Sequence, residues 1–386
     1  MEDEDERFFS RLSAAMSAFG LTPFSGSVAI GYLRAQLAKD AGAETCARVM
    51  AFLLNRLNRK HHLAHRSLVH PGQMGCPNIL PGLRAQPIWG KGGPGSLLRE
   101  AFPWVALFED NVDIIRREFL ALRGSSAFQP YRSPAPSFSS PSSSSPADAP
   151  PNASDSLGQL ATDRGAWNVA YLHLHGLDFA DNLALCPRTA ALLAAVPRHY
   201  SHAFFSALAP GSHITPHFGP TNKKLRCHLP LIVPDIKAEP GPSVLTPAGT
   251  ASTSIGSLGG EGGAAGMTGP AWLRVGDSTV TLEVGQCVLF DDSFLHEAGN
   301  ESLSPRVVLV IDVWHPDLSD PEVRFLQFLN KGQMGAAARL AKLREQKGGA
   351  GDKEDFLSVI REARRGAADM ASGLEGSIWP HTVVDD

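Results

Sequence analysis

The fold of this chain is decided by the stretch Leu225-Arg226-Cys227-His228-Leu229-Pro230-Leu231, in which every odd-numbered position is apolar. Successive side chains of a β-strand point to opposite faces of the sheet. The alternation therefore predicts a strand with one buried apolar face, and it places Arg226 and His228 together on the other face. Charged side chains that face into a barrel are unfavourable unless ligands neutralise them. The stretch predicts both a sheet and a polar site inside it.

Further short strands follow this stretch without helical patterns between them. They are expected at Gln286–Phe290, at Arg306–Val313, and at Trp272–Val275 and Thr279–Leu282, the last two joined as a hairpin by Gly276-Asp277. In the longest of these strands Arg306, Val308, Val310 and Asp312 share one face. Short strands with glycine turns favour an antiparallel barrel or jelly roll over about residues 200–316. The expected fold class is mainly β with flanking helices.

The regions around this barrel have different patterns. Apolar residues at helical spacing predict helices within residues 1–65, at 103–122, at Phe325–Leu343 and at Glu354–Arg365. Two low-complexity tracts, at about 133–158 and 237–270, cannot bury enough apolar surface to become ordered, and we expect disordered insertions there. The predicted organisation is a helical N-terminal region at 1–78, a central domain at 79–318 and a helical C-terminal extension at 319–386.

The composition excludes several classes of protein. The 386 residues contain 35 Lys and Arg against 39 Asp and Glu, and phosphate binding requires a concentrated basic face, so nucleic acid is not an expected partner. The five cysteines form no Cys-x-x-Cys pair, which argues against a disulfide scaffold or a thiolate zinc site. No apolar run is long enough to cross a bilayer, and the acidic start of the chain is unlike a secretory signal. A cytoplasmic location is therefore expected by default.

Four side chains near the ends of the predicted strands suit one chemistry. His217 precedes a Gly-Pro turn and His296 lies in a polar loop, while Arg226 and Arg306 lie on strands. Two imidazoles can hold Fe(II) and leave positions open for a co-substrate and O₂. Arginine makes planar, two-pronged contacts to carboxylates, so two arginines can hold a 2-oxo acid that carries a second carboxylate.

The string His-Phe-Gly-Pro-Thr-Asn-Lys-Lys-Leu-Arg-Cys-His-Leu at 217–229 resembles the signature of the aspartyl/asparaginyl β-hydroxylase family. Phe-Asp-Asp-Ser-Phe-Leu-His-Glu at 290–297 and the segment from Arg306 to Pro316 are similar to the rest of that signature, in the same order. The resemblance covers about residues 79–318 apart from the two low-complexity tracts. The upstream segments that resemble the opening part of the family's domain are Pro81–Pro87 and Leu107–Glu118.

The resemblance implies a non-haem Fe(II)- and 2-oxoglutarate-dependent dioxygenase on a double-stranded β-helix, the cupin-like form of the jelly roll. By matching position, His217 and His296 would be the iron ligands. The commoner enzymes of this chemistry add a carboxylate two residues after the first histidine. This chain has Gly219 there, and the family it resembles also lacks that ligand. The resemblance therefore implies a water in that position, with Asp292 to orient it.

The same resemblance implies which residues hold 2-oxoglutarate. Arg226 and His228 would bind the end nearest to the iron, and Arg306 with Ser206 would bind the distal carboxylate. Trp167 is a weaker match to a tryptophan that lines the co-substrate pocket in the family.

The implied activity is hydroxylation of the β-carbon of Asp or Asn in a protein or peptide substrate, with O₂ as the oxidant. Three alternatives stay open: the same chemistry on a lipid-linked acyl chain or small molecule, a catalytically silent barrel that acts as a binding module, and a zinc hydrolase, which the lack of an evident third protein ligand disfavours. Each histidine could also be a hydrogen-bonded core residue, and Arg226 could be a salt-bridge partner of Asp291 or Asp292. Lys223-Lys224, Leu295 and the single Cys186 differ from the family pattern, so the resemblance does not identify the substrate.

Overall fold

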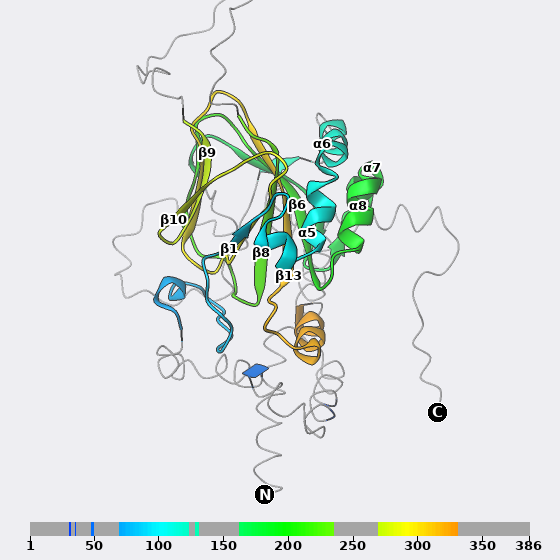
Figure 1. Cartoon of the computed structure of the whole chain (residues 1–386), viewed down its shortest axis with the longest axis vertical. Coiled ribbons are helices and arrows are strands. Elements are labelled where there is room, and N and C mark those ends of the chain that lie inside the picture. The colour runs from blue at the N-terminus through cyan, green and yellow to red at the C-terminus, as the bar shows by residue number, and fades with distance from the viewer. Residues whose placement is uncertain are drawn as a thin grey trace, which may run out of the picture.

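The computed structural model describes residues 31, 35, 48, 49, 69–122, 128–130, 162–234 and 269–330. This part of the chain is arranged in three layers: a small β-sheet, a large β-sheet packed against it, and helices on the outer side of the large sheet (Figure 1). The predicted helix at Glu354–Arg365, most of the one within 1–65, and the tracts at 133–158 and 237–268 lie outside the described residues.

The large sheet has eight strands in the order β1-β11-β8-β13-β6-β4-β2, with β5 paired to β4, and the small sheet has five in the order β10-β9-β12-β7-β3. All of these pairings are antiparallel. The prediction of a mainly β, double-stranded β-helix is confirmed. The strands of the large sheet are β1 Ile88–Lys91, β2 Gln129–Pro130, β4 Trp167–Leu174, β5 Leu177–Asp178, β6 His199–Leu208, β8 Lys224–Ile232, β11 Val288–Phe290 and β13 Arg306–Trp314. Those of the small sheet are β3 Thr162–Arg164, β7 Ser212–His217, β9 Ala271–Val275, β10 Ser278–Thr281 and β12 His296–Asn300.

Strand β8 has the two faces that its sequence predicts. The apolar set Leu225, Cys227, Leu229 and Leu231 is fully buried in the core between the large sheet and the helices. Arg226 and His228 line a cavity on the opposite face, between the two sheets. The neighbouring strand β13 also alternates, because Val307 and Leu309 join the helix-side core whereas Val308 and Val310 join the core between the sheets. The predicted hairpin is present as β9 and β10, with Val275 paired to Ser278 across the turn.

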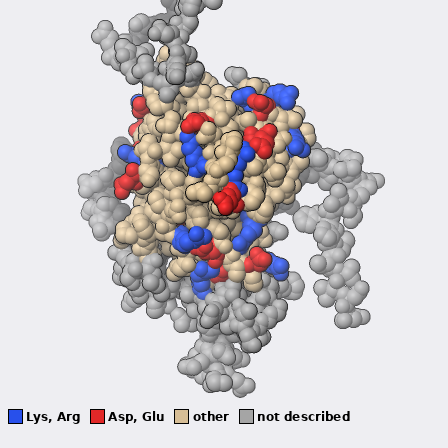
Figure 2. All heavy atoms as spheres, in the orientation of Figure 1, with Lys and Arg blue, Asp and Glu red and all other residues tan. Residues whose placement is uncertain are grey.

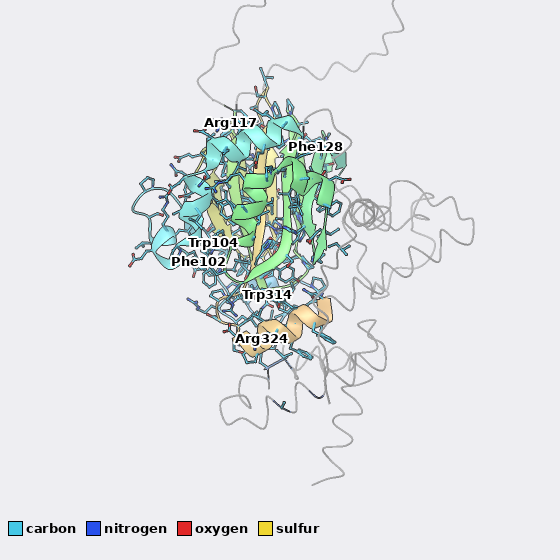
Figure 3. All side chains as sticks on the ribbon, turned by 90° about the vertical axis from the view of Figure 1, so that its right-hand side faces the viewer. Phe102, Trp104, Arg117, Phe128, Trp314 and Arg324 are labelled. Carbon is cyan, nitrogen blue, oxygen red and sulfur yellow. The ribbon has the colours of Figure 1, made fainter. Side chains whose placement is uncertain are left out.

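The helices cover the outer face of the large sheet, as Figures 1 and 3 show, with Trp104 on α5 and Arg117 on α6. The prediction of one helix over 103–122 was wrong, because two helices, α5 Trp104–Glu109 and α6 Val112–Ala121, occupy this stretch. The side chain of Asn111 donates to the Leu107 carbonyl at 2.8 Å and so takes the acceptor that a continuous helix would offer to a backbone N–H. The other helical elements are η3 Pro71–Gln73, α4 Leu97–Ala101, α7 Ala180–Leu185 and α8 Pro187–Ala194.

Residues 320–330 are helical, which agrees with the start of the helix predicted at Phe325–Leu343, and Figure 3 shows Arg324 on this segment below Trp314. Among the residues that the structure describes, no helix has both the length and the apolar character required to cross a membrane. On the face shown in Figure 2, acidic and basic side chains are intermixed and no continuous basic patch is visible.

Candidate functional site

Two histidines face each other on neighbouring strands of the small sheet. The pairing of β7 with β12 places His217 opposite His296, and their ring centroids are 4.1 Å apart. The Nδ1 atom of His217 lies 2.8 Å from the Thr215 carbonyl, and that of His296 lies 2.9 Å from the Phe294 carbonyl. Because a carbonyl can only accept, Nδ1 carries the proton in each ring and Nε2 keeps its lone pair.

The environment favours the neutral form of both rings. Burial lowers the pKa of His217, and burial together with the neighbouring His217 ring lowers the pKa of His296 well below its usual value. Neutral imidazoles whose Nδ1–H is fixed by a carbonyl are the form in which histidine ligates a metal. The pair can therefore offer two nitrogen ligands to one cation. No group of three or more His, Cys, Asp or Glu side chains with metal-binding geometry occurs within the described ranges.

One cavity between the two sheets brings together all of the predicted site residues except Asp292. The polar side chains that line it are Trp167, Ser206, His217, Arg226, His228, His296, Glu297 and Arg306. Its apolar wall comes from the core between the sheets, including Phe204 and Phe290. Burial lowers the pKa of His228 well below its usual value, and its Nδ1 has no hydrogen-bond partner among the residues that the structure describes. The neutral ring can thus exchange a hydrogen bond with a ligand in the cavity.

Arg306 at the start of β13 is a buried cation for which the described residues provide no counter-charge. The residue is 1% exposed, and its Nε and Nη2 atoms have no hydrogen-bond partner within the described part of the chain. Burial alone lowers the pKa of this guanidinium to about 10. Nearby, Trp167 Nε1 donates to Ser206 Oγ at 2.9 Å, so the Ser206 hydroxyl keeps its own proton to donate elsewhere. Buried guanidinium and hydroxyl donors in one cavity can bind an anion.

Arg226, by contrast, is paired within the protein. Its Nε and Nη2 atoms contact the two Asp312 oxygens at 2.8 and 2.9 Å, and its Nη1 lies 3.3 Å from Asp292 Oδ2. Lys224 Nζ lies 2.6 Å from Asp292 and 3.0 Å from Asp312. Burial would raise the pKa of Asp312, but Arg226 and Lys224 hold it well below its usual value. Of the two partners considered from sequence, Asp292 contacts Arg226, whereas Asp291 accepts from Ser293 and Gln73 instead.

Gly219 occupies the position at which the commoner enzymes of this chemistry have a metal-binding carboxylate, and the packing around it leaves no room for a side chain. Gly219 N donates to the Asp292 carbonyl at 2.6 Å, and a Cβ at Gly219 would lie 2.6 to 2.7 Å from the carboxyl group and carbonyl of Asp292. A side chain at this position would therefore displace Asp292. Asp292 is fully buried, does not line the cavity, and has one carboxylate oxygen, Oδ1, without a partner in the described residues.

Four residues at this site were not identified from the sequence: Glu297, Lys224, Asp312 and His202, whose Nδ1 lies 3.2 Å from Asp312. Nor was an outer cavity of about 400 Å³ that shares His296 and Glu297 with the inner one. The strand alternation already placed Asp312 on the Arg306 face, so a signal for that residue existed. The other residues that line the outer cavity are Pro216, Arg274, Gly276, Asp277, Thr279 and Leu295.

Comparisons with known proteins agree with the resemblance in the sequence. The model of the aspartyl/asparaginyl beta-hydroxylase family matches residues 109–316. Human aspartate beta-hydroxylase domain-containing protein 2 is 33% identical over 177 residues, which is 44% of this chain and 39% of that protein. Human aspartyl/asparaginyl beta-hydroxylase is 29% identical over 168 residues, 42% of this chain and 18% of that protein.

A bacterial relative is matched over a larger share of its length. The ornithine lipid ester-linked acyl 2-hydroxylase of Rhizobium tropici is 28% identical over 227 residues, 58% of this chain and 62% of that protein. The chain spans about two fifths of the first of these relatives and less than two thirds of each of them. Because the family model matches more than half of the sequence, this chain belongs to the aspartyl/asparaginyl β-hydroxylase family.

Proposed function

We propose that this protein is an Fe(II)- and 2-oxoglutarate-dependent dioxygenase that hydroxylates the β-carbon of Asp or Asn residues in a protein substrate. The observation that carries the proposal is one cavity in which the His217–His296 pair lies together with the unpaired cation of Arg306. A metal-ligand pair and an isolated guanidinium in one enclosed space suit a co-substrate that binds metal at one end and carries a carboxylate at the other. Residues 79–318 would form the catalytic domain.

The residues present fit Fe(II). His217 and His296 would hold it through their Nε2 atoms, since each Nδ1 is committed to a backbone carbonyl. When bound, Fe(II) would supply O₂ activation and couple the oxidation of 2-oxoglutarate to succinate and CO₂ with hydroxylation of the substrate. Asp292, whose Oδ1 is unpartnered within the described ranges, would orient a water that completes the metal's coordination.

The donor groups that line the cavity also suit 2-oxoglutarate. Arg306 and Ser206 would hold its distal carboxylate, because they present buried donors that the described protein leaves without acceptors. Arg226 and His228 would donate to the end that binds the metal. Trp167 positions the Ser206 hydroxyl by donating to its oxygen. The role of the chain in the reaction is to orient the co-substrate and to keep water from the reacting atoms.

The residues that line the outer cavity favour a peptide as the substrate. It adjoins the metal site through His296, and its wall carries Arg274, Asp277 and Thr279, which can exchange hydrogen bonds with a peptide backbone and polar side chains. The second candidate substrate is an acyl chain. Two observations favour it: the similarity to the Rhizobium tropici acyl hydroxylase, and Leu295, which is 42% exposed at this cavity.

The test is anaerobic reconstitution with Fe(II) and 2-oxoglutarate, followed by O₂ with either peptide pools or acyl-lipid micelles. Succinate release is measured, and mass spectrometry of the substrates reports added oxygen. A gain of one oxygen on Asp or Asn supports the proposal, and a gain on the acyl chain supports the second candidate. No 2-oxoglutarate-dependent change in the iron spectrum would indicate a silent barrel, and succinate release by His217→Ala equal to wild type would refute the site.

A further inference from the structure

Four buried charges next to the cavity form a closed ring, here called the charge ring: Lys224, Arg226, Asp292 and Asp312. Each cation contacts both carboxylates, and each carboxylate contacts both cations, at distances between 2.6 and 3.3 Å. The side chains of Lys224, Asp292 and Asp312 are completely inaccessible to solvent, and that of Arg226 is 13% exposed. Removing one partner from such a buried set leaves a charge without compensation and is strongly destabilising, so the four groups are expected to depend on one another.

The charge ring fixes the orientation of Arg226. Arg226 and Asp312 are paired residues of β8 and β13, so the backbone register of the large sheet sets the distance between them. The two-pronged contact of Nε and Nη2 with Asp312 then sets the plane of the guanidinium. Of the four ring residues, only Arg226 lines the inner cavity, and it is therefore the member that can contact a ligand there directly.

The charge ring also joins Arg226 to Asp292. Lys224 Nζ bridges Asp292 and Asp312, two carboxylates that would otherwise repel each other in a space without solvent. The imidazole of His202 lies 3.2 Å from Asp312, and burial lowers its pKa, which favours the neutral form. Two cations and two anions therefore leave the ring neutral.

We propose that Asp312 and Lys224 are positioning residues for the reaction, an inference that rests on the function proposed above. Asp312 holds the guanidinium of Arg226 in the orientation that receives the metal-proximal end of 2-oxoglutarate. Lys224 couples this arrangement to Asp292, the residue assigned to the metal-bound water. Neither residue touches the co-substrate, because neither lines the cavity.

The test compares variants that break the charge ring in different ways. Asp312→Asn and Lys224→Met each leave one charge unbalanced, and the double variant removes one charge of each sign. Each is examined by thermal unfolding and by calorimetric titration of 2-oxoglutarate into the Fe(II)-loaded protein without O₂. Both single variants are expected to unfold at lower temperature and to bind 2-oxoglutarate about tenfold or more weakly, the usual effect of losing a group that orients a ligand-binding residue.

The double variant separates positioning from charge balance. It is expected to recover most of the thermal stability but not the affinity for 2-oxoglutarate, because Arg226 still lacks its anchor. Arg226→Lys, which keeps the charge and loses the two-pronged contact, is expected to lose affinity with a smaller loss of stability. Asp317→Asn, which removes an ion pair with Arg84 outside the ring, is the control and is expected to retain wild-type affinity.

Recovery of affinity together with stability in the double variant would overturn the positioning role and leave a purely structural one. Wild-type affinity in Asp312→Asn would also overturn it. If the wild-type protein binds no 2-oxoglutarate and releases no succinate, the proposed function itself fails, and this result differs from either of the other two.

Discussion

Replacing Arg306 with Met is expected to make the ligand-free protein more stable while greatly weakening its affinity for 2-oxoglutarate. Burial lowers the pKa of Arg306 to about 10, well below the usual value of an arginine, without an opposing contribution from a neighbouring carboxylate. A folded-state pKa below the unfolded value means that the folded protein binds this proton less tightly. The charge therefore reduces the free energy of unfolding at every pH below about 10, and the reduction is relieved only as the pH rises from there towards the usual pKa of an arginine.

The size of the destabilisation follows from the difference between the pKa values of Arg306 in the folded and unfolded states. Each pKa unit corresponds to about 1.4 kcal/mol, so the buried charge destabilises the ligand-free fold by about 3 kcal/mol. Methionine keeps most of the apolar stem of Arg306 and fills a similar space, so the variant is expected to recover much of this amount. On the ligand side, a hydrogen bond to a charged group contributes about 1.5–3 kcal/mol. Two lost bonds to the distal carboxylate would weaken 2-oxoglutarate binding by about 100-fold or more.

The assay is urea unfolding at neutral pH, with and without 2-oxoglutarate and Fe(II) under anaerobic conditions. Wild type is expected to gain stability from the ligand, as any protein does when only its folded state binds. The Arg306→Met variant is expected to start from a higher free energy of unfolding and to gain much less from 2-oxoglutarate.

Arg226→Met is the matched control, because it removes the same side chain from a paired environment. It leaves Asp312 and Asp292 with Lys224 as their only cation in the charge ring, and removing one member of a buried ion pair typically destabilises by about 3–5 kcal/mol. Arg306→Met should thus raise the free energy of unfolding of the ligand-free protein, whereas Arg226→Met should lower it. The reasoning is refuted if Arg306→Met destabilises the ligand-free protein as much as Arg226→Met does, or if it still binds 2-oxoglutarate with wild-type affinity.

Three further outcomes are expected. His217→Ala should lose Fe(II) binding in a metal titration. His213→Ala is the control and should keep Fe(II) binding, because His213 lies on the same strand but is paired with Glu297. Equal Fe(II) binding by the two variants would contradict the ligand assignment. Gly219→Ala should lower the free energy of unfolding by about 1–3 kcal/mol, because its Cβ displaces a buried carboxyl group, and unchanged thermal unfolding would count against this packing. Burial raises the pKa of Asp291 to about 7, so between pH 4 and pH 7 the unfolded chain loses this proton while the folded protein keeps it. The free energy of unfolding of wild type should therefore fall by up to about 4 kcal/mol relative to Asp291→Asn over this range. A pH-independent difference between the two proteins in urea unfolding would argue against the raised pKa.

Much of the fold could be predicted because its signal is local. The alternation in β8 is sufficient to assign its two faces, and the same rule assigns those of β13. The break between α5 and α6 could not be predicted from periodicity, because the apolar residues continue in helical register through it. The break depends on one side-chain hydrogen bond, from Asn111 to the Leu107 carbonyl. Composition and period do not report whether such a bond forms.

The residues of the candidate site likewise differ in whether the sequence alone could identify them. The strand pattern and the family signature together identify the residues that line the cavity, because each lies at a recognisable position on its own strand or loop. The partner of Arg226 could not be identified in this way, since Asp312 lies 86 residues away and meets it only through the register of β8 with β13. From sequence, Asp291 and Asp292 were equally plausible partners, and only the three-dimensional arrangement distinguishes them.

The two arginines of the cavity have opposite electrostatic roles, and this difference suits an unsymmetrical ligand. Near the His217–His296 pair, a divalent metal would itself supply the positive charge that attracts a carboxylate, and an uncompensated guanidinium beside it would repel the metal. Neutralising Arg226 with Asp312 removes that repulsion while keeping its N–H donors in place. At the distal end no metal is available, so the attraction must come from the protein, and there Arg306 has no counter-charge in the described structure. Under the proposed function, the pairing of one arginine and the isolation of the other would therefore select the direction in which 2-oxoglutarate binds.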